Sequence, residues 1–192
     1  MPPFIAIFIV LIVVVLLFMS INIYNGLVEL KNQLERSWAN IDVILKQRSD
    51  EIPMLVQIIE QYTNYEAGLL QKLADSRTRY GTARSTDEKI NSSLELGQAL
   101  SGILAIGEAY PELKANQDFI KLQERISGLE STLADRRELY NETVTNFNTR
   151  LEQFPDVIAA RLLNYRKQLM FKITAEERQK PNLKMNLPKF KA

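Results

Sequence analysis

The clearest chemical pattern in the chain lies at residues 136–155, which read RRELYNETVTNFNTRLEQFP. An aromatic residue precedes asparagine at Tyr140-Asn141 and again, seven residues later, at Phe147-Asn148. A third copy, Tyr24-Asn25, occurs far upstream. Aromatic rings, amides and the nearby arginines are also the side chains that line ligand pockets, so one interpretation is a binding site. The other is that the aromatics fill a helical core while the amides hydrogen-bond to a neighbouring helix.

The register of this segment favours the packing interpretation. Apolar residues recur every seven positions at Phe119, Ile126, Leu133, Tyr140, Phe147 and Phe154. The accompanying apolar positions drift around the helix, because seven residues are not two whole turns of a straight helix. Asn141 and Asn148 then lie at the edge of the buried face, about 100° from the line of aromatics. A nearly straight helix in a broad bundle fits this drift better than a long two-stranded supercoil.

The residues needed for catalysis are few. The chain has no cysteine and no histidine, which removes thiolates, the commonest general base and the commonest metal ligand. The carboxylate pairs Asp87-Glu88 and Glu176-Glu177 fall at helix starts or in polar stretches, where capping or solvation explains them. Asp42 is the better candidate for a buried acid, with Lys46 or Arg48 as a partner at helical spacing. A hydrolase that uses Asp42 and Glu108 is the weakest hypothesis, and we predict no enzyme, no cofactor and no metal.

The charge distribution argues against a nucleic-acid partner. The formal net charge of the 192 residues is only +1. Arg77, Arg79 and Arg84 cluster near Tyr80, but they lack the wider basic surface that phosphate tracking requires.

The N-terminus predicts a membrane anchor. Residues 4–19 contain no polar side chain, and extending the stretch to residue 24 makes it long enough to cross a bilayer core of roughly 30 Å. A cleaved signal peptide is the alternative, but the chain lacks a basic leader and a good cleavage site. Lys31 and Arg36 follow the span, so the positive-inside rule predicts an outside N-terminus and a cytoplasmic domain.

The remaining sequence predicts an all-α protein in which the anchor helix continues into an elongated antiparallel bundle. We expect this first helix to end at QRSDEIP, residues 47–53, and a second helix capped by Ser49 or Asp50 to run to Tyr80. Further helices are expected after the capping box Ser85–Glu88, after Asn116 or Asp118, and after Pro155 as far as Leu169.

Two further features complete the expected organisation. The small residues Gly97, Ser101 and Ala105 should pack inside the bundle, although such a row can also mediate dimers in membranes. The predicted units are an anchor over 1–26, a bundle over 27–175 and a basic, extended tail over 176–192. That tail either keeps the chain soluble or is attracted to anionic lipid.

Two stretches carry a resemblance to a known family. YNGLVELKNQLERSWANIDVILKQRSDEIPMLVQIIEQY (24–62) and EAYPELKANQDFIKLQERISGLESTLADRRELYNETVTNFNTRLEQFP (108–155) closely resemble hallmark regions of LemA-family proteins. Pro181-Asn182-Leu183 is similar to the end of the family, less specifically. The resemblance implies a prokaryotic protein with one membrane span and a domain of long helices, and no established enzymatic activity. It also implies a link, in some relatives, to invaginated organelle membranes in magnetosome-forming bacteria.

Taken with the residues, this favours a membrane-anchored helical scaffold that acts through self-association or a protein partner. Residues 4–24 would contact lipid, and a homo-oligomer is expected. The candidate packing or partner-facing residues are Tyr24, Asn25, Trp38, Asp42, Tyr140, Asn141, Phe147 and Asn148. The alternative is a ligand-binding or sensory module with a pocket between helices.

Overall fold

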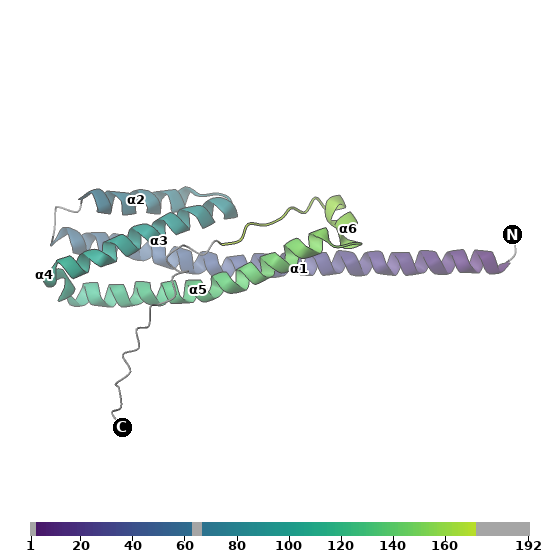
Figure 1. Cartoon of the computed structure of the whole chain (residues 1–192), viewed down its shortest axis with the longest axis horizontal. Coiled ribbons are helices and arrows are strands. Elements are labelled where there is room, and N and C mark those ends of the chain that lie inside the picture. The colour runs from purple at the N-terminus through teal and green to yellow at the C-terminus, as the bar shows by residue number, and fades with distance from the viewer. Residues whose placement is uncertain (1–2, 63–66, 172–192) are drawn as a thin grey trace, which may run out of the picture.

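The computed structural model describes residues 3–62 and 67–171, and these ranges contain helices and no strand (Figure 1). The predicted all-α class is confirmed. The helices are α1 (Pro3–Glu60), α2 (Ala67–Thr82), α3 (Thr86–Ala109), α4 (Pro111–Lys114), α5 (Gln117–Glu152) and α6 (Asp156–Leu162).

Helix α1 forms the axis of the molecule. Its 58 residues correspond to about 87 Å at the usual rise per residue. The first part projects from one end of the bundle with its apolar side chains exposed, and it is long and apolar enough to cross a membrane (Figure 1). From Leu27 onward, a stripe of buried residues faces the other helices: Leu27, Leu34, Ile41, Leu45, Ile52, Leu55 and Ile59. The same helix therefore forms both the candidate span and a wall of the core.

The predicted break at residues 47–53 is wrong, because α1 continues through Pro53 to Glu60. Proline has no backbone N–H, so the carbonyl of Ser49 loses its usual helical donor. Arg77 of α2 supplies the replacement, since its Nε donates to that carbonyl at 3.1 Å. The neighbouring Ile52 and Leu55 remain in the core. The predicted second helix is thus the end of α1 followed by a separate α2.

Helix α5 packs along α1 in the opposite direction. Arg48 meets Glu130, Trp38 meets Tyr140, and Gly26 lies against Arg150. Helices α2 and α3 form a hairpin that packs over the part of this pair farthest from the N-terminus (Figure 1). The buried apolar residues of all these helices form one cluster.

The ends of the middle helices follow the local sequence signals. The Ser85 side chain accepts a hydrogen bond from the Glu88 amide, and the Glu88 carboxylate accepts one from the Ser85 amide. The predicted capping box at the start of α3 is therefore confirmed. Asn116 caps α5 by accepting from the amides of Asp118 and Phe119. The predicted inward packing of Ser101 and Ala105 is wrong, because both are exposed while α3 buries the face that carries Leu96, Leu100 and Ile103.

The C-terminal part differs from its prediction in two ways. Phe154 was expected in the core but is 81% exposed, because α5 ends at Glu152 and Phe154 lies in the following turn. The predicted helix to Leu169 stops at Leu162, where Asn164 takes a left-handed conformation with φ of 54°. From there to Phe171 the chain is non-helical and runs back along the bundle (Figure 1). The predicted tail, 176–192, lies outside the described residues.

Candidate functional site

The two asparagines of the aromatic-Asn repeat bind the backbone of this returning segment. The Asn148 side chain accepts from the Gln168 amide at 2.9 Å and donates to the Gln168 carbonyl at 3.0 Å. The Asn141 side chain makes the same pair of bonds to Phe171, at 2.8 and 2.9 Å. We call these four bonds the asparagine clamp. Each side-chain amide thus forms with one residue of the segment the two hydrogen bonds that a residue of a neighbouring β-strand would form.

The spacing of the clamp follows from elementary geometry. Seven residues of helix separate Asn141 from Asn148, which is about 10.5 Å at 1.5 Å per residue. Three residues of extended chain separate Gln168 from Phe171, which is about 10 Å. One helical heptad therefore matches three extended residues, so the two amides stay in register with the segment. The sequence pattern predicts these amides at a packing edge facing a neighbouring helix, whereas their partner is the extended segment.

Aromatic rings fill the space beneath the clamp. Trp38 of α1, Tyr140 of α5 and Phe171 form a cluster in which every pair of ring centroids lies between 5.7 and 6.1 Å apart. The Tyr140 hydroxyl donates to the Leu169 carbonyl at 3.2 Å. Burial raises the pKa of Tyr140 to about 12. Arg137 stacks over the Phe171 ring at 5.0 Å.

The second aromatic of the repeat has the same role one heptad later. Phe147 is buried and packs against Tyr165, with centroids 5.9 Å apart. The Lys31 ammonium of α1 lies over the Tyr165 ring, 5.5 Å from its centroid. Tyr24 and Asn25 do not join this arrangement, because both are exposed on α1 at the end of its apolar part. The repeat in α5 is thus a device for seating the C-terminal segment on the bundle.

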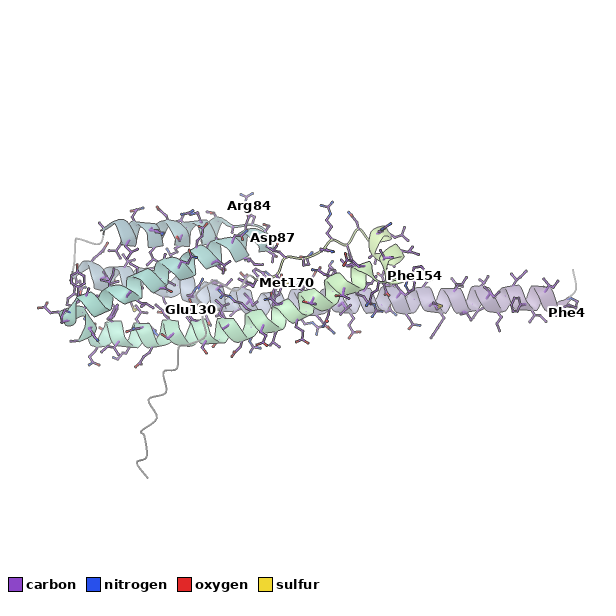
Figure 2. All side chains as sticks on the ribbon, in the orientation of Figure 1. Phe4, Arg84, Asp87, Glu130, Phe154 and Met170 are labelled. Carbon is purple, nitrogen blue, oxygen red and sulfur yellow. The ribbon has the colours of Figure 1, made fainter. Side chains whose placement is uncertain are left out.

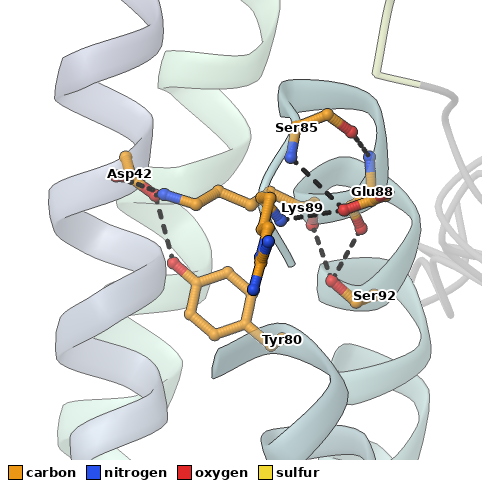
Figure 3. Close-up of polar contacts among 7 residues, drawn as sticks. Asp42, Tyr80, Ser85, Glu88, Lys89 and Ser92 are labelled. Atoms are coloured by element: carbon orange, nitrogen blue, oxygen red, sulfur yellow. Dashed lines mark hydrogen bonds and ion pairs between the residues drawn. The ribbon is translucent and has the colours of Figure 1, made fainter. Parts of the chain in front are cut away.

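Asp42 lies in a separate polar cluster between α1, α2 and α3 (Figure 3). Lys89 contacts both carboxylate oxygens at 2.8 Å, and the Tyr80 hydroxyl donates to one of them at 3.2 Å. The expected partners Lys46 and Arg48 are therefore wrong. They lie on the same helix, whereas the actual partners come from helices that fold against it. Burial, with the neighbouring Asp42 charge, raises the pKa of Tyr80 well above its usual range.

An open groove of about 510 Å³ adjoins this cluster. Cationic and anionic groups both line it, from Lys46, Asp50, Arg77 and Lys89 as well as Asp42. Asp42 is already neutralised by a cation and hydrogen-bonded by a phenol, so it is poorly suited to act as a general base. The groove can offer charged hydrogen-bond partners to a small polar ligand.

Sequence reasoning missed the most buried charge in the described chain, Arg48. Its side chain is fully buried, with Nη1 at 2.7 Å from Glu130 and Nη2 at 2.7 Å from the Ser93 carbonyl. Its Nε has no hydrogen-bond partner among the residues that the structure describes. A Cβ on Gly97 would come within 3.3 Å of Nη1, so the glycine lets the guanidinium approach α3. The signal was present in the sequence, since residue 48 falls on the stripe formed by Ile41, Leu45, Ile52 and Leu55.

The other chemical candidates are explained by local contacts. Glu88 accepts from the backbone amides of Arg84 and Ser85, which lowers the pKa of its carboxyl. Arg79 pairs with Glu95 at 3.1 Å, and Arg77 caps the Ser49 carbonyl. Within residues 3–62 and 67–171, no three acidic side chains converge as a metal site would require. The side chain of Glu108 and the pair Glu176-Glu177 lie outside the described part of the chain.

These features define a class of protein: a single apolar N-terminal helix that continues into an antiparallel bundle, with a C-terminal segment seated on α5. The chain belongs to the LemA family, whose family model matches residues 37–185. Protein LemA of Metamycoplasma hominis is 23% identical over 179 residues, which cover 91% of this chain and 80% of that protein.

Two magnetosome proteins are also similar to the chain. MamQ 1 and MamQ 2 of Paramagnetospirillum magneticum are each 21% identical over 159 residues. The match covers 69% of this chain and 58% of each MamQ protein, so the chain spans little more than half their length. In this chain, α1 is long and apolar enough to cross a membrane.

Proposed function

We propose that the protein is a non-enzymatic, membrane-anchored helical scaffold that acts through self-association or partner binding. The observation that carries this proposal is the continuity of α1 from its apolar end through Pro53 to the distal end of the bundle. A helix without a break transmits the orientation of the span to the domain, as a flexible linker would not. The closed aromatic packing around the asparagine clamp also favours a structural role over catalysis.

The exposed surface of the bundle supplies the contact faces. Val43 and Leu139 are large apolar side chains with about half of their area in water. They lie on α1 and α5, away from the apolar N-terminal part. Lys31 and Arg36 follow the span, and by the positive-inside rule the bundle then lies in the cytoplasm.

The experiment is photocrosslinking in cells from single positions on the bundle. A crosslinking amino acid replaces Val43 in one variant and Leu139 in another, in the full chain. We expect discrete adducts, either of two copies or of one copy with a defined partner. Monomer alone at both positions, with the protein in the membrane fraction, would refute a scaffold. A protease-protection assay on the same cells reports on which side the bundle lies.

The groove beside Asp42 favours one alternative, a ligand-binding or sensory module. It combines charged groups from α1, α2 and α3, so a ligand there would bridge helices. Screening anionic and zwitterionic metabolites against the detergent-purified chain should then give thermal stabilisation with at least one of them. The Lys89→Met variant, which removes a lining cation, should lose that stabilisation. Stabilisation that survives in Lys89→Met would place the ligand elsewhere.

A further inference from the structure

An exposed apolar surface lies at the end of the bundle from which the candidate span projects. It consists of Phe154, Ile158 and Leu162, which are 81%, 56% and 84% exposed. Ile158 and Leu162 are four residues apart and so share one face of α6. The opposite side of α6 packs inward, with Asp156 and Ala160 buried. We call the three exposed residues the α6 apolar face.

The antiparallel register fixes where this face lies along α1. Arg150, near the end of α5, packs on Gly26, because a Cβ on that glycine would come within 3.3 Å of its guanidinium. Gly26 follows the last residue of the apolar stretch, Tyr24, by only two positions. Since α5 runs opposite to α1, residues after Arg150 reach the level of Tyr24. Figure 2 shows Phe154 at the end of the bundle from which the apolar part of α1 projects.

That level is the expected boundary of the bilayer. Residues 4–24 form about 31 Å of helix, which matches the roughly 30 Å hydrocarbon core. Tyr24 and Phe154 are both exposed there, and aromatic residues favour the interface between lipid and water. An apolar helix face at that depth can bury itself among lipid head groups and upper acyl chains.

The charges around the α6 apolar face suit a lipid surface. The two acidic groups next to the α6 apolar face in the sequence are paired with cations: Asp156 accepts from Arg150 at 2.8 Å, and Glu152 pairs with Lys167. The side chains of Arg161 and Arg166 are exposed nearby in sequence. Cations beside an exposed apolar face are the pattern by which surface helices hold anionic lipid.

We propose that the α6 apolar face docks into the interface of the same bilayer that α1 crosses. The inference rests on the membrane anchor of the proposed function, and it adds a second contact that α1 alone does not supply. A single span leaves the whole rod, span and bundle together, free to tilt and rotate in the bilayer. With α6 against the lipid, the Arg150–Asp156 pair and its packing on Gly26 fix the bundle in one orientation.

The experiment uses the full chain, which contains no cysteine, so single labels can be introduced without a background. Leu162→Cys carries an environment-sensitive fluorophore, and Val43→Cys is the matched control. Val43 is also an exposed apolar residue, but it lies about 28 Å along α1 from Tyr24. Each labelled protein is placed in nanodiscs of phosphatidylcholine and phosphatidylglycerol at one chain per disc. Quenching by lipids that carry a shallow nitroxide is then measured.

We expect several-fold stronger lipid quenching at position 162 than at position 43, with a matching loss of quenching by water-soluble iodide. Equal quenching at the two positions would overturn the proposal. Protection of position 162 from iodide without lipid quenching would overturn it as well, because a protein surface would then cover the face. One chain per disc removes self-association from the measurement. The result is therefore independent of whether the chain self-associates.

Discussion

Arg48 occupies a position on α1 where the flanking pattern calls for an apolar side chain. Its guanidinium is fully buried, and its carboxylate partner Glu130 is only partly so, with 38% of the side chain exposed. A buried ion pair gains little over an apolar pair of the same shape, because both charges must be removed from water. Removal of one partner is a different matter, since the remaining charge stays buried without compensation.

These contacts predict an asymmetry between two substitutions. Glu130→Ala leaves Arg48 charged in the core and should lower the free energy of unfolding by about 2 kcal/mol, allowing for the partial exposure of Glu130. Arg48→Met removes the buried charge and leaves Glu130 to water, so its effect should stay near 1 kcal/mol. Denaturant titration of the full chain in detergent, followed by circular dichroism, measures both.

The control for this comparison is the exposed pair Lys31–Glu35, at 3.6 Å. Glu35→Ala should change the free energy of unfolding by less than about 0.5 kcal/mol. If Glu130→Ala were as mild as Glu35→Ala, the Arg48 pair would not stabilise the core as described.

Single residues also show what the sequence alone could not supply. The position of Arg48 on an apolar stripe is visible in the sequence, whereas the partner of Asp42 is not. Local spacing offers only Lys46 or Arg48, while Lys89 lies 47 positions away and reaches Asp42 through the packing of α3. Side-chain partners across helices depend on the tertiary arrangement, so periodicity cannot name them.

At the scale of elements, the asparagine clamp couples α5 to a segment without regular structure. Asn141→Ala or Asn148→Ala removes two hydrogen bonds and exposes a pair of backbone groups to water. We expect each to lower the free energy of unfolding by only about 1–2 kcal/mol. The local effect should be larger: amide hydrogen exchange in residues 165–171 should accelerate several-fold, while α5 itself stays protected.

The third aromatic-Asn pair provides the control for the clamp. Asn25→Ala alters the same dipeptide pattern, but Asn25 is exposed and bonds to no part of the segment within the described residues. Hydrogen-exchange mass spectrometry of Asn25→Ala should match that of the unaltered chain. Unchanged protection of residues 165–171 in Asn148→Ala would contradict the role of the Asn148 amide in holding the segment.

The capping box of α3 predicts a dependence on pH. Hydrogen bonds from the amides of Arg84 and Ser85 lower the pKa of Glu88 below its ordinary value of 4.5. The charged form is thus favoured in the fold, so its contribution is present above pH 4.5 and is lost as the pH falls through the lowered value. The stability difference between the unaltered chain and Glu88→Gln, measured by thermal unfolding, should shrink on acidification from pH 7. A difference that grows instead would contradict the capping role.

The elements differ in how far apart in the sequence the interacting residues lie that determine their structure. The heptad stripe of α5, its Asn116 cap and the capping box of α3 depend on neighbours within a few residues, and the sequence predicts all three. The passage of α1 through Pro53 depends on Arg77, 28 positions from the carbonyl that it satisfies. The extended run to Phe171 depends on amides 20 and 30 positions away. Local patterns therefore predict a break in α1 at Pro53, where the distant partner Arg77 allows the helix to continue. They also predict a helix as far as Leu169, where distant amides hold an extended segment.

At the scale of the whole molecule, α1 makes span and bundle a single rod, and the α6 apolar face adds a second contact with the same bilayer. Insertions after Tyr24 separate these two effects. One inserted alanine rotates the bundle by about 100° about the axis of α1 and raises it by about 1.5 Å. Seven alanines turn it through about 700°, within about 20° of its original phase, but raise it by about 10.5 Å.

Two readouts then test the rod and the docking surface independently. Crosslinking between copies at Val43→Cys should fall with one alanine and recover with seven, because it follows the rotational phase of a continuous helix. Lipid quenching at labelled Leu162→Cys should fall with seven alanines, because that insertion lifts α6 away from the bilayer. A flexible insertion of seven glycine and serine residues is the matched control, and it should lose the phase dependence of the crosslink. Equal crosslinking in the one-alanine and seven-alanine proteins would mean that the span does not set the orientation of the bundle, and the continuity of α1 would then have no mechanical consequence.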